Sequence, residues 1–231
     1  MIINKINNII FGLSKKKDGQ MILRENGKGL KNRIKYFSNF GIDAKSIVSA
    51  EIIHDNNIAI ISDKDKGKII KETDGLVTNI KNICLTVTVS DCLPIFIYDK
   101  KKEIIGIAHA SWKCIVKNII YNIIEKFKNQ YHANPKDLKV FIGPHIKKCH
   151  FEVKEDILDK FSKYQEFIIK KDSRYFIDLE EIVKKQLVFL GLNSKNIKIS
   201  SECTYCNKEY FSFRRDKPER VDSQVAYICL N

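Results

Sequence analysis

The chain has 231 residues, of which 44% are hydrophobic and 30% are charged. This composition excludes a disordered protein, and the length suits one α/β domain with an ample core, which we expect to span residues 1–231. The formal net charge of +13 raises the question of nucleic acid binding. The lysines are spread over the whole chain, however, and no RNA-binding signature accompanies them, so we expect no nucleic acid partner.

Seven cysteines are scattered through the chain, an odd number in a protein that is large enough not to need cross-links. This pattern indicates reduced thiols and a cytoplasmic protein. The first segment, MIINKINNIIFG, has a lysine among its apolar residues and no small-residue cleavage site, so it predicts a strand or hairpin over residues 2–13 and no signal peptide. Because no apolar run approaches about 18 residues, we expect no membrane partner.

The next pattern along the chain is helical. Leu30, Ile34 and Phe37 recur at i, i+4 and i+7, which predicts a helix whose apolar face they form and which ends at Gly41. An apolar run over residues 48–53 then predicts a strand that leads directly to His54.

The central segment, residues 83–113, contains the strongest strand pattern. Apolar runs over residues 83–89, 94–98 and 104–108 predict three strands that lie side by side. Cys92 separates the first two runs, and His109 closes the third. A helix follows, with Ile115, Ile119 and Phe127 on one apolar face. Strand ends that lead into helices are where α/β folds place their functional side chains, so we expect the chemistry here.

The last third of the chain alternates short strands and helices. The patterns predict strands over residues 138–142, 197–200, 211–215 and 224–230, and amphipathic helices over residues 154–163 and 178–191. The paired Arg214 and Arg215 end one strand, where only one of them can point into a pocket because neighbouring residues face opposite sides. Together these elements predict an α/β (α+β) fold, a single domain with a mixed β-sheet core flanked by helices.

Three dispersed residues form a candidate metal site. Cys92 and His109 are 17 residues apart (109 minus 92), too far for a local zinc finger, so a third ligand must come from elsewhere, and His54 at a strand end is the best candidate. One cysteine with two histidines suits zinc, with a fourth position open for water or substrate. Spacing alone leaves open that Cys92 is a core residue and that the histidines are ordinary polar residues.

A second group of metal-binding residue types follows later in the chain. Cys149 and His150 could combine with Cys203 and Cys206 around a metal. One Cys-x-x-Cys motif without a matching second pair is weak evidence, so the sequence alone does not predict this site.

The segment Ser90-Asp91-Cys92-Leu93-Pro94, followed by His109-Ala110-Ser111-Trp112-Lys113, resembles the Ala-Asp-Cys-Leu-Pro and His-Ala-Gly-Trp-Arg motifs of the laccase-domain or polyphenol oxidase family. The better-supported activity of that family is purine nucleoside phosphorolysis, with adenosine deaminase activity. Other similar motifs follow in the family's order over nearly the whole chain: Thr73-Asp74-Gly75-Leu76-Val77-Thr78, Ile142-Gly143-Pro144-His145-Ile146, Phe151-Glu152-Val153, Asp178-Leu179, Cys203-Thr204 and Phe211-Ser212-Phe213-Arg214-Arg215.

This resemblance implies that His54, Cys92 and His109 are zinc ligands in a purine nucleoside phosphorylase. Phosphate, the co-substrate, would attack the sugar of adenosine, inosine, guanosine or methylthioadenosine and release the base and ribose 1-phosphate. It also implies that the site residues are Cys92, His109, Lys113 and one of Arg214 and Arg215, in a monomer or weak homodimer whose partners are the nucleoside and phosphate.

Several positions depart from the family pattern. Lys113 replaces an arginine. An ammonium cannot bind phosphate through two directed hydrogen bonds as a guanidinium does, so any binding of phosphate here is weaker and less directional. Ile52 replaces a glutamine, which removes an amide from near the metal ligands, and Ser111 and Cys114 replace glycines. Deamination also needs a proton shuttle, for which the candidates are Asp91 and Glu152.

Two alternatives remain open. The family's older name implies a copper polyphenol oxidase, but such an enzyme needs a histidine-rich cluster and this chain has five histidines and no His-x-His pair. A Cys-His-His site could still take copper in vitro. The other alternative is a non-catalytic protein that holds a structural metal or binds RNA, and steep salt dependence of binding would favour its RNA form.

Overall fold

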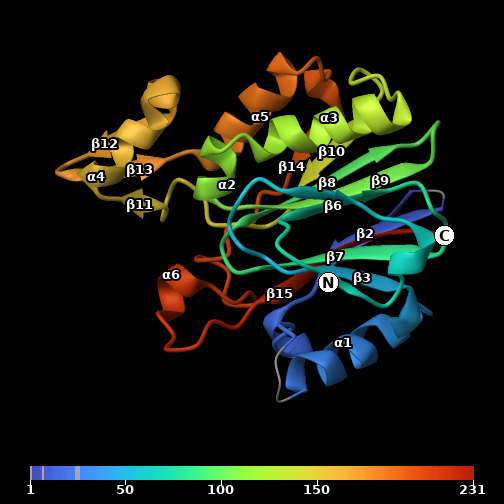
Figure 1. Ribbon diagram of the computed structural model, residues 1–231. Helices are drawn as coiled ribbons and strands as arrows, with labels where there is room; N and C mark the ends of the chain where they lie inside the picture. The colour runs from blue at the N-terminus through green and yellow to red at the C-terminus, as the bar shows by residue number, and fades with distance from the viewer. Residues whose placement is uncertain (1, 7, 24–26) are drawn as a thin grey trace.

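The computed structural model describes residues 2–6, 8–23 and 27–231, and its centre consists of two facing six-stranded sheets (Figure 1). The first sheet contains, in spatial order, β1 (Ile2–Ile6), β2 (Ile9–Leu13), β15 (Gln224–Leu230), β7 (Ile83–Val89), β3 (Ile47–Ala50) and β5 (Ile69–Ile70). The second contains β14 (Ile197–Ile199), β10 (Lys139–Ile142), β8 (Leu93–Asp99), β9 (Ile104–Ala110), β6 (Gly75–Thr78) and β4 (Ile58–Ile60). Both sheets combine parallel and antiparallel pairs.

One apolar core fills the space between the two sheets. Leu85 and Ile228 from the first sheet and Phe96 and Ile107 from the second belong to it, and all four are buried. The rings of Phe11 and Phe96 lie 5.3 Å apart across this space. Because each sheet is half of this core, neither could bury its inner face without the other.

Helices cover the outer faces of both sheets. The helices α3 (Ile119–Tyr131) and α5 (Leu179–Phe189) pack on the second sheet, and α1 (Lys28–Ser38) packs on the first, which gives the layer order helix, sheet, sheet, helix (Figure 1). The packing of α3 on β9 is close, since a Cβ atom added to Gly106 would lie 2.7 Å from the Phe127 ring. The predicted α/β class, with a mixed β-sheet core flanked by helices, is confirmed.

A small third sheet lies beside the sandwich, at the left of Figure 1. It contains β11 (Glu152–Val153), β13 (Arg174–Ile177) and β12 (Ile168–Lys171). The helix predicted over residues 154–163 is wrong in part, because α4 (Glu155–Leu158) is followed by a 3-10 segment over Asp159–Phe167. Phe161 has non-helical dihedral angles there, and its side chain is fully buried. The helix therefore breaks at the residue whose ring enters the core.

The prediction of three strands side by side in the central segment is wrong for the first of them. β8 and β9 are antiparallel neighbours, but β7 belongs to the opposite sheet, between β15 and β3. The chain crosses from one sheet to the other at Asp91, whose φ of 75° is left-handed. Apolar periodicity marks strands but does not indicate which sheet each one joins.

The predicted apolar face of α1 is wrong for two of its three residues. Leu30 and Ile34 are 51% and 48% exposed, whereas Phe37 is buried as predicted, together with Arg33 and Tyr36. Arg33 donates hydrogen bonds from its buried guanidinium to the Met21 carbonyl (2.6 Å) and the Ser49 hydroxyl (2.8 Å). Because a charged arginine lies on the buried face of α1, a pattern based on hydrophobicity does not identify that face.

The expectation of seven reduced thiols is wrong for one pair. Cys84 on β7 and Cys229 on β15 are directly opposite each other in the antiparallel register, and the structure joins them in a disulfide. The other five cysteines are free. Among the residues that the structure describes, no helix combines the length and apolar character needed to cross a membrane.

Candidate metal centre

Three side chains from separate elements meet at one end of the sheet sandwich. His54 follows β3, Cys92 precedes β8, and His109 lies on β9. Their potential ligand atoms all lie within 4.8 Å of one another. The imidazole rings of His54 and His109 are nearly perpendicular, with centroids 4.8 Å apart. The fold therefore brings together the three residues that the sequence singled out.

Asp74 organises two of these residues. Its carboxylate accepts a hydrogen bond of 2.8 Å from Nδ1 of His109, which leaves Nε2 free to bind a metal. The same carboxylate accepts bonds from the backbone N–H groups of Ile53, His54 and Asp55 at 3.3, 3.1 and 2.9 Å. These bonds hold the loop in which His54 has a left-handed φ of 60°.

The sequence patterns did not predict this role of Asp74. The only signal was its place in the motif Thr73-Asp74-Gly75, which the resemblance had already matched. Asp74 is fully buried, and burial opposes its charge, but the hydrogen bonds from His109 and the backbone outweigh this and hold the pKa of Asp74 below its ordinary value.

The electrostatics of the three side chains fit a divalent metal ion. Burial and the neighbouring His109 lower the pKa of His54, so its imidazole is neutral at pH 7, as metal binding requires. Burial raises the pKa of the Cys92 thiol, so its thiolate needs a nearby positive charge. Two imidazoles and one thiolate are ligands that zinc accepts, with a fourth position left open.

Asp91 fixes the turn that presents Cys92. Its carboxylate accepts hydrogen bonds from the hydroxyls of Thr204 (2.6 Å) and Ser212 (3.0 Å) and from the backbone N–H of Arg214 (2.8 Å). Both carboxylate oxygens are therefore engaged. These contacts favour an anchoring role for Asp91 over that of a proton shuttle.

A cleft with a volume of about 1090 Å³ opens beside the three candidate ligands. His54, Cys92 and His109 line it, as do the cationic side chains of Lys113, Arg33 and Arg214. Its walls also include apolar side chains from the loop after β3, from α2 (Trp112–Val116), from β11 and the residue before it, and from α4: Ile52, Ile53, Trp112, Phe151, Val153 and Ile157. The cleft therefore combines a metal-binding corner, positive charge and apolar surface.

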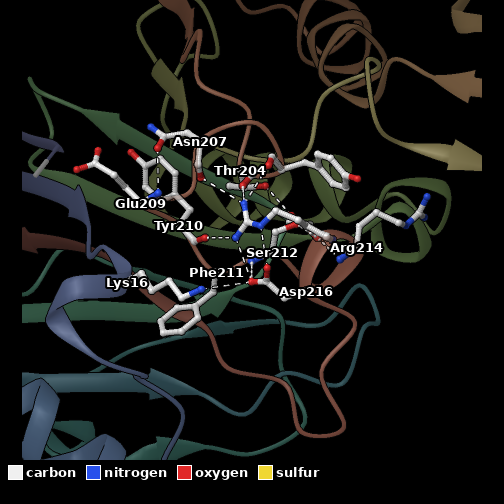
Figure 2. Close-up of polar contacts among 12 residues, drawn as sticks. Lys16, Thr204, Asn207, Glu209, Tyr210, Phe211, Ser212, Arg214 and Asp216 are labelled. Carbon is white, nitrogen blue, oxygen red and sulfur yellow. Dashed lines mark hydrogen bonds and ion pairs between the residues drawn. The ribbon is translucent and has the colours of Figure 1, made fainter.

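The two arginines of the last motif have different surroundings. Arg214 lines the cleft, whereas Arg215 donates hydrogen bonds to the backbone carbonyls of Thr204 (2.7 Å) and Tyr210 (2.7 Å) and pairs with Asp216 (2.8 Å). Figure 2 shows Arg214 extended away from the network that joins Thr204, Tyr210 and Asp216. Of the two arginines, only Arg214 faces the cleft, and the prediction that one of them would do so agrees with this. The predicted strand over residues 211–215, however, is wrong.

Residues 213–216 form the short helix α6 (Phe213–Asp216). Ser212 caps it, because its hydroxyl accepts a hydrogen bond of 3.2 Å from the backbone N–H of Arg215. Ser212 at the N-cap and the buried Asp91, which accepts a hydrogen bond from the backbone N–H of Arg214, favour a helical turn over an extended strand. Because this segment contains apolar residues, the sequence pattern predicted a strand here and not a helical turn.

The departures at Ser111 and Cys114 have a local structural role. Ser111 is the N-cap of α2, and its hydroxyl accepts a bond of 3.3 Å from the backbone N–H of Cys114. The Cys114 thiol is fully buried and lies 3.7 Å from the Asp74 carboxylate. Cys114 therefore packs behind the candidate metal centre, whereas Ser111 also lines the cleft.

Comparisons with known proteins agree with this architecture. A family model described as multi-copper polyphenol oxidoreductase laccase matches residues 25–231. The chain belongs to this family. The resemblance seen in the motifs is thereby confirmed.

Named relatives of the family share a common description. The chain is 32% identical to the purine nucleoside phosphorylase YlmD of Bacillus subtilis over 81% of this chain and 72% of that protein. It is 37% identical to the purine nucleoside phosphorylase CA_C1699 of Clostridium acetobutylicum over 68% of this chain and 67% of that protein. The structure is similar to that of the hypothetical protein YfiH of Bacillus licheniformis, with a TM-score of 0.92, 27% identity and coverage of 97% and 94% of the two chains.

Proposed function

We propose that this protein is a zinc-dependent purine nucleoside phosphorylase. The observation that carries the proposal is that His54, Cys92 and His109 converge at one corner of a cleft that also presents Lys113 and Arg214. Two named relatives of the family are purine nucleoside phosphorylases, which supports the same reaction class. His54, Cys92 and His109 would hold the zinc.

Phosphorolysis requires an anion and a nucleoside to meet in one site. A phosphate oxygen forms a bond to C1′ of the ribose, the C1′–N9 bond breaks, and the base leaves with the bonding electrons and takes up a proton. Lys113 and Arg214 carry the positive charge that would bind the phosphate and offset its negative charge in the cleft. Arg33, buried in the cleft wall, adds to this potential.

The apolar wall would bind the purine ring. Ile52, Phe151 and Ile157 line the cleft together with the cations, so a flat aromatic base and a charged phosphate find different surfaces within one cavity. When bound, zinc supplies a Lewis acid with an open coordination position. Asp74 would orient His109 and hold the His54 loop, and so keep the three ligands in place before the substrate binds.

We extend the proposal to adenosine deamination at the same site. This reaction replaces the amino group of the purine with oxygen from water and releases ammonia, so it needs a group that moves protons. Glu152 lines the cleft and its carboxylate is partly exposed, 3.7 Å from Arg174. Since the carboxylate of Asp91 is fully engaged, Glu152 is the better candidate of the two.

The test is base release from adenosine and inosine by the zinc-loaded protein, with and without phosphate. We expect base release that depends on phosphate. His109→Ala should lose at least about 100-fold, because removal of a ligand should cost more than the roughly 10-fold to 100-fold lost with a ligand's hydrogen-bond partner. His132→Asn, which changes an exposed histidine at the end of α3, should keep full activity. Ammonia from adenosine would add the deaminase.

The alternatives give different outcomes in the same assay. If the zinc-loaded protein turns over neither nucleoside, the phosphorylase proposal is wrong. Oxidation of a phenol by the copper-loaded protein alone would show that copper can occupy the Cys-His-His site, as the donor set permits. A protein in which the metal is only structural would bind zinc and release no base from either nucleoside, with or without phosphate.

A further inference from the structure

A second cluster of metal-binding side chains lies outside the cleft. Cys149 and His150 follow the loop after β10, and Cys203 and Cys206 lie on the loop after β14. One potential ligand atom from each residue lies within 4.8 Å of all the others. The cleft-lining side chains include none of these four, so the proposed phosphorylase site does not use them.

The distances within this cluster are those of a tetrahedral site. Four ligands around zinc, with Zn–S bonds of about 2.3 Å, place two sulfur atoms about 3.8 Å apart, and a sulfur and a nitrogen about 3.5 Å apart. Sγ of Cys149 lies 3.8 Å from Sγ of Cys203 and 3.9 Å from Sγ of Cys206. Nδ1 of His150 lies 3.1 Å from Sγ of Cys149 and 3.4 Å from Sγ of Cys206.

The surroundings also orient the potential ligands. The His150 ring stacks on the Tyr205 ring, with centroids 3.9 Å apart and planes 16° from parallel, so Nδ1 is held on the side of the thiols. The backbone N–H of Lys147 points at Sγ of Cys203 at 3.5 Å, a weak hydrogen bond that favours a negatively charged sulfur. Cys203 is buried, whereas Cys149 and Cys206 are exposed.

We propose that Cys149, His150, Cys203 and Cys206 form a second, structural zinc site. Three thiolates and one imidazole complete a tetrahedron and leave no position for substrate, which is the composition of structural rather than catalytic zinc sites. Soft thiolate ligands in tetrahedral geometry select zinc over magnesium or calcium. The chain would then bind two zinc ions with different roles.

This second site connects two loops that support the cleft. His145 and Cys203 form a parallel β-bridge, and the backbone N–H of Thr204 donates to the His145 carbonyl at 3.0 Å. The hydroxyl of Thr204 in turn binds Asp91, which presents Cys92. A zinc ion that joins the two loops would therefore stabilise the position of Asp91 from outside the cleft.

Metal counting on the purified full-length chain, kept under reductant, tests the proposal. We expect two zinc ions per chain in the unaltered protein and one in His54→Ala/Cys92→Ser/His109→Ala, which removes the first site and leaves the second. The reciprocal variant Cys149→Ser/Cys206→Ser should also retain one. The two variants are matched controls, since each removes one set of ligands and preserves the other.

Cobalt substitution reports the ligands directly. We expect the variant without the first site to bind one Co²⁺ per chain, with intense thiolate-to-cobalt absorption in the near ultraviolet and the strong visible bands of a tetrahedral ion. His150→Ala in that background should shift the visible bands and leave the thiolate absorption. A six-coordinate spectrum with no thiolate absorption would overturn the proposal.

Two other results would also overturn it. One is a folded variant without the first site that binds neither zinc nor cobalt. The other is a disulfide between any two of Cys149, Cys203 and Cys206 in protein that was purified with zinc and without oxidant. If one of the two multiple variants fails to fold, the zinc count of the other still decides the question, because each variant empties a different site. Cys149 and Cys206 are exposed, so their substitution leaves the core unchanged.

Discussion

Asp74 is the residue on which the candidate metal centre depends most after the ligands themselves. It binds the imidazole of His109 and three backbone N–H groups of the His54 loop, and no water competes with these bonds because Asp74 is fully buried. A neutral side chain that presents only one acceptor oxygen cannot satisfy all these donors.

We expect Asp74→Asn to weaken zinc binding by about 10-fold to 100-fold, as loss of a carboxylate partner of a metal-bound histidine does. Competition with a chromogenic chelator measures this affinity. The matched control is Asp65→Asn, which changes a carboxylate that binds the backbone and hydroxyl of Ser62 in a turn away from the cleft. Equal zinc affinities for the two variants would contradict the role given to Asp74.

Lys113 is the position where a single substitution would restore the family's arginine. Its ammonium is a point charge on a flexible stem, 5.9 Å from the centre of the Trp112 ring. In Lys113→Arg, a guanidinium adds a second directed hydrogen bond to phosphate, so we expect the KM for phosphate to fall about fivefold, equivalent to about 1 kcal/mol.

Initial rates against phosphate concentration test this expectation. Lys117→Arg is the control, because Lys117 pairs with Asp55 at the surface and should leave the KM for phosphate unchanged. If Lys113→Arg raises this KM or leaves it unaltered, Lys113 does not bind the phosphate.

At the scale of elements, Glu180 ties α5 to the loop after β10. Its carboxylate forms an ion pair with Lys147 and lies 3.2 Å from Nε2 of His145. Burial alone would raise the pKa of Glu180, but the neighbouring His145 and Lys147 outweigh it and lower the pKa to about 2. Because the folded-state pKa lies below the unfolded value, this group stabilises the fold above pH 4.5 and loses that effect as the pH falls toward 2.

We therefore expect Glu180→Gln to lower the free energy of unfolding at pH 7 on the order of 2 kcal/mol, and the difference from the unaltered protein to shrink below pH 4. Urea denaturation of both proteins between pH 7 and pH 3 measures it. Glu181→Gln removes only a surface pair with Lys184 and should cost much less. A Glu180→Gln difference that stays constant down to pH 3 would contradict the pKa argument.

At the scale of the whole molecule, the core shared by the two sheets predicts that the chain unfolds as one unit. The single domain over residues 1–231 stays a prediction, and cooperativity is its test. Leu85→Ala creates a cavity on the first sheet and should cost about 2–5 kcal/mol. We expect it to shift the transition seen by Trp112 fluorescence, on the side of the second sheet, as much as the transition seen by far-ultraviolet circular dichroism.

The control is Phe189→Ala, which truncates a side chain that is 89% exposed at the end of α5 and should move neither transition. Zinc concentration is held fixed in all samples, since bound metal shifts apparent stability. If Leu85→Ala separates the two transitions, the sheets unfold independently and the single-domain prediction is wrong.

The amino-acid sequence alone was enough to predict the class of fold, most of the strands and α5, and the three residues that converge at the candidate metal centre. Apolar periodicity is local, so it marks elements such as β9 and α5 wherever the buried face consists of apolar residues. Their positions at strand ends made His54, Cys92 and His109 candidates, but because they belong to separate elements, only the resemblance implied that they form one ligand set.

How these elements combine became visible in the folded structure. It placed β7 and β8 in opposite sheets, turned Arg214 toward the cleft and Arg215 toward backbone carbonyls, and brought Cys149 next to Cys203. Each of these contacts depends on backbone direction at a turn, such as the left-handed φ of Asp91, and on pairing between distant strands. Hydrophobic patterns indicate which face of an element is buried, and they specify neither the backbone direction at a turn nor the partner of a strand.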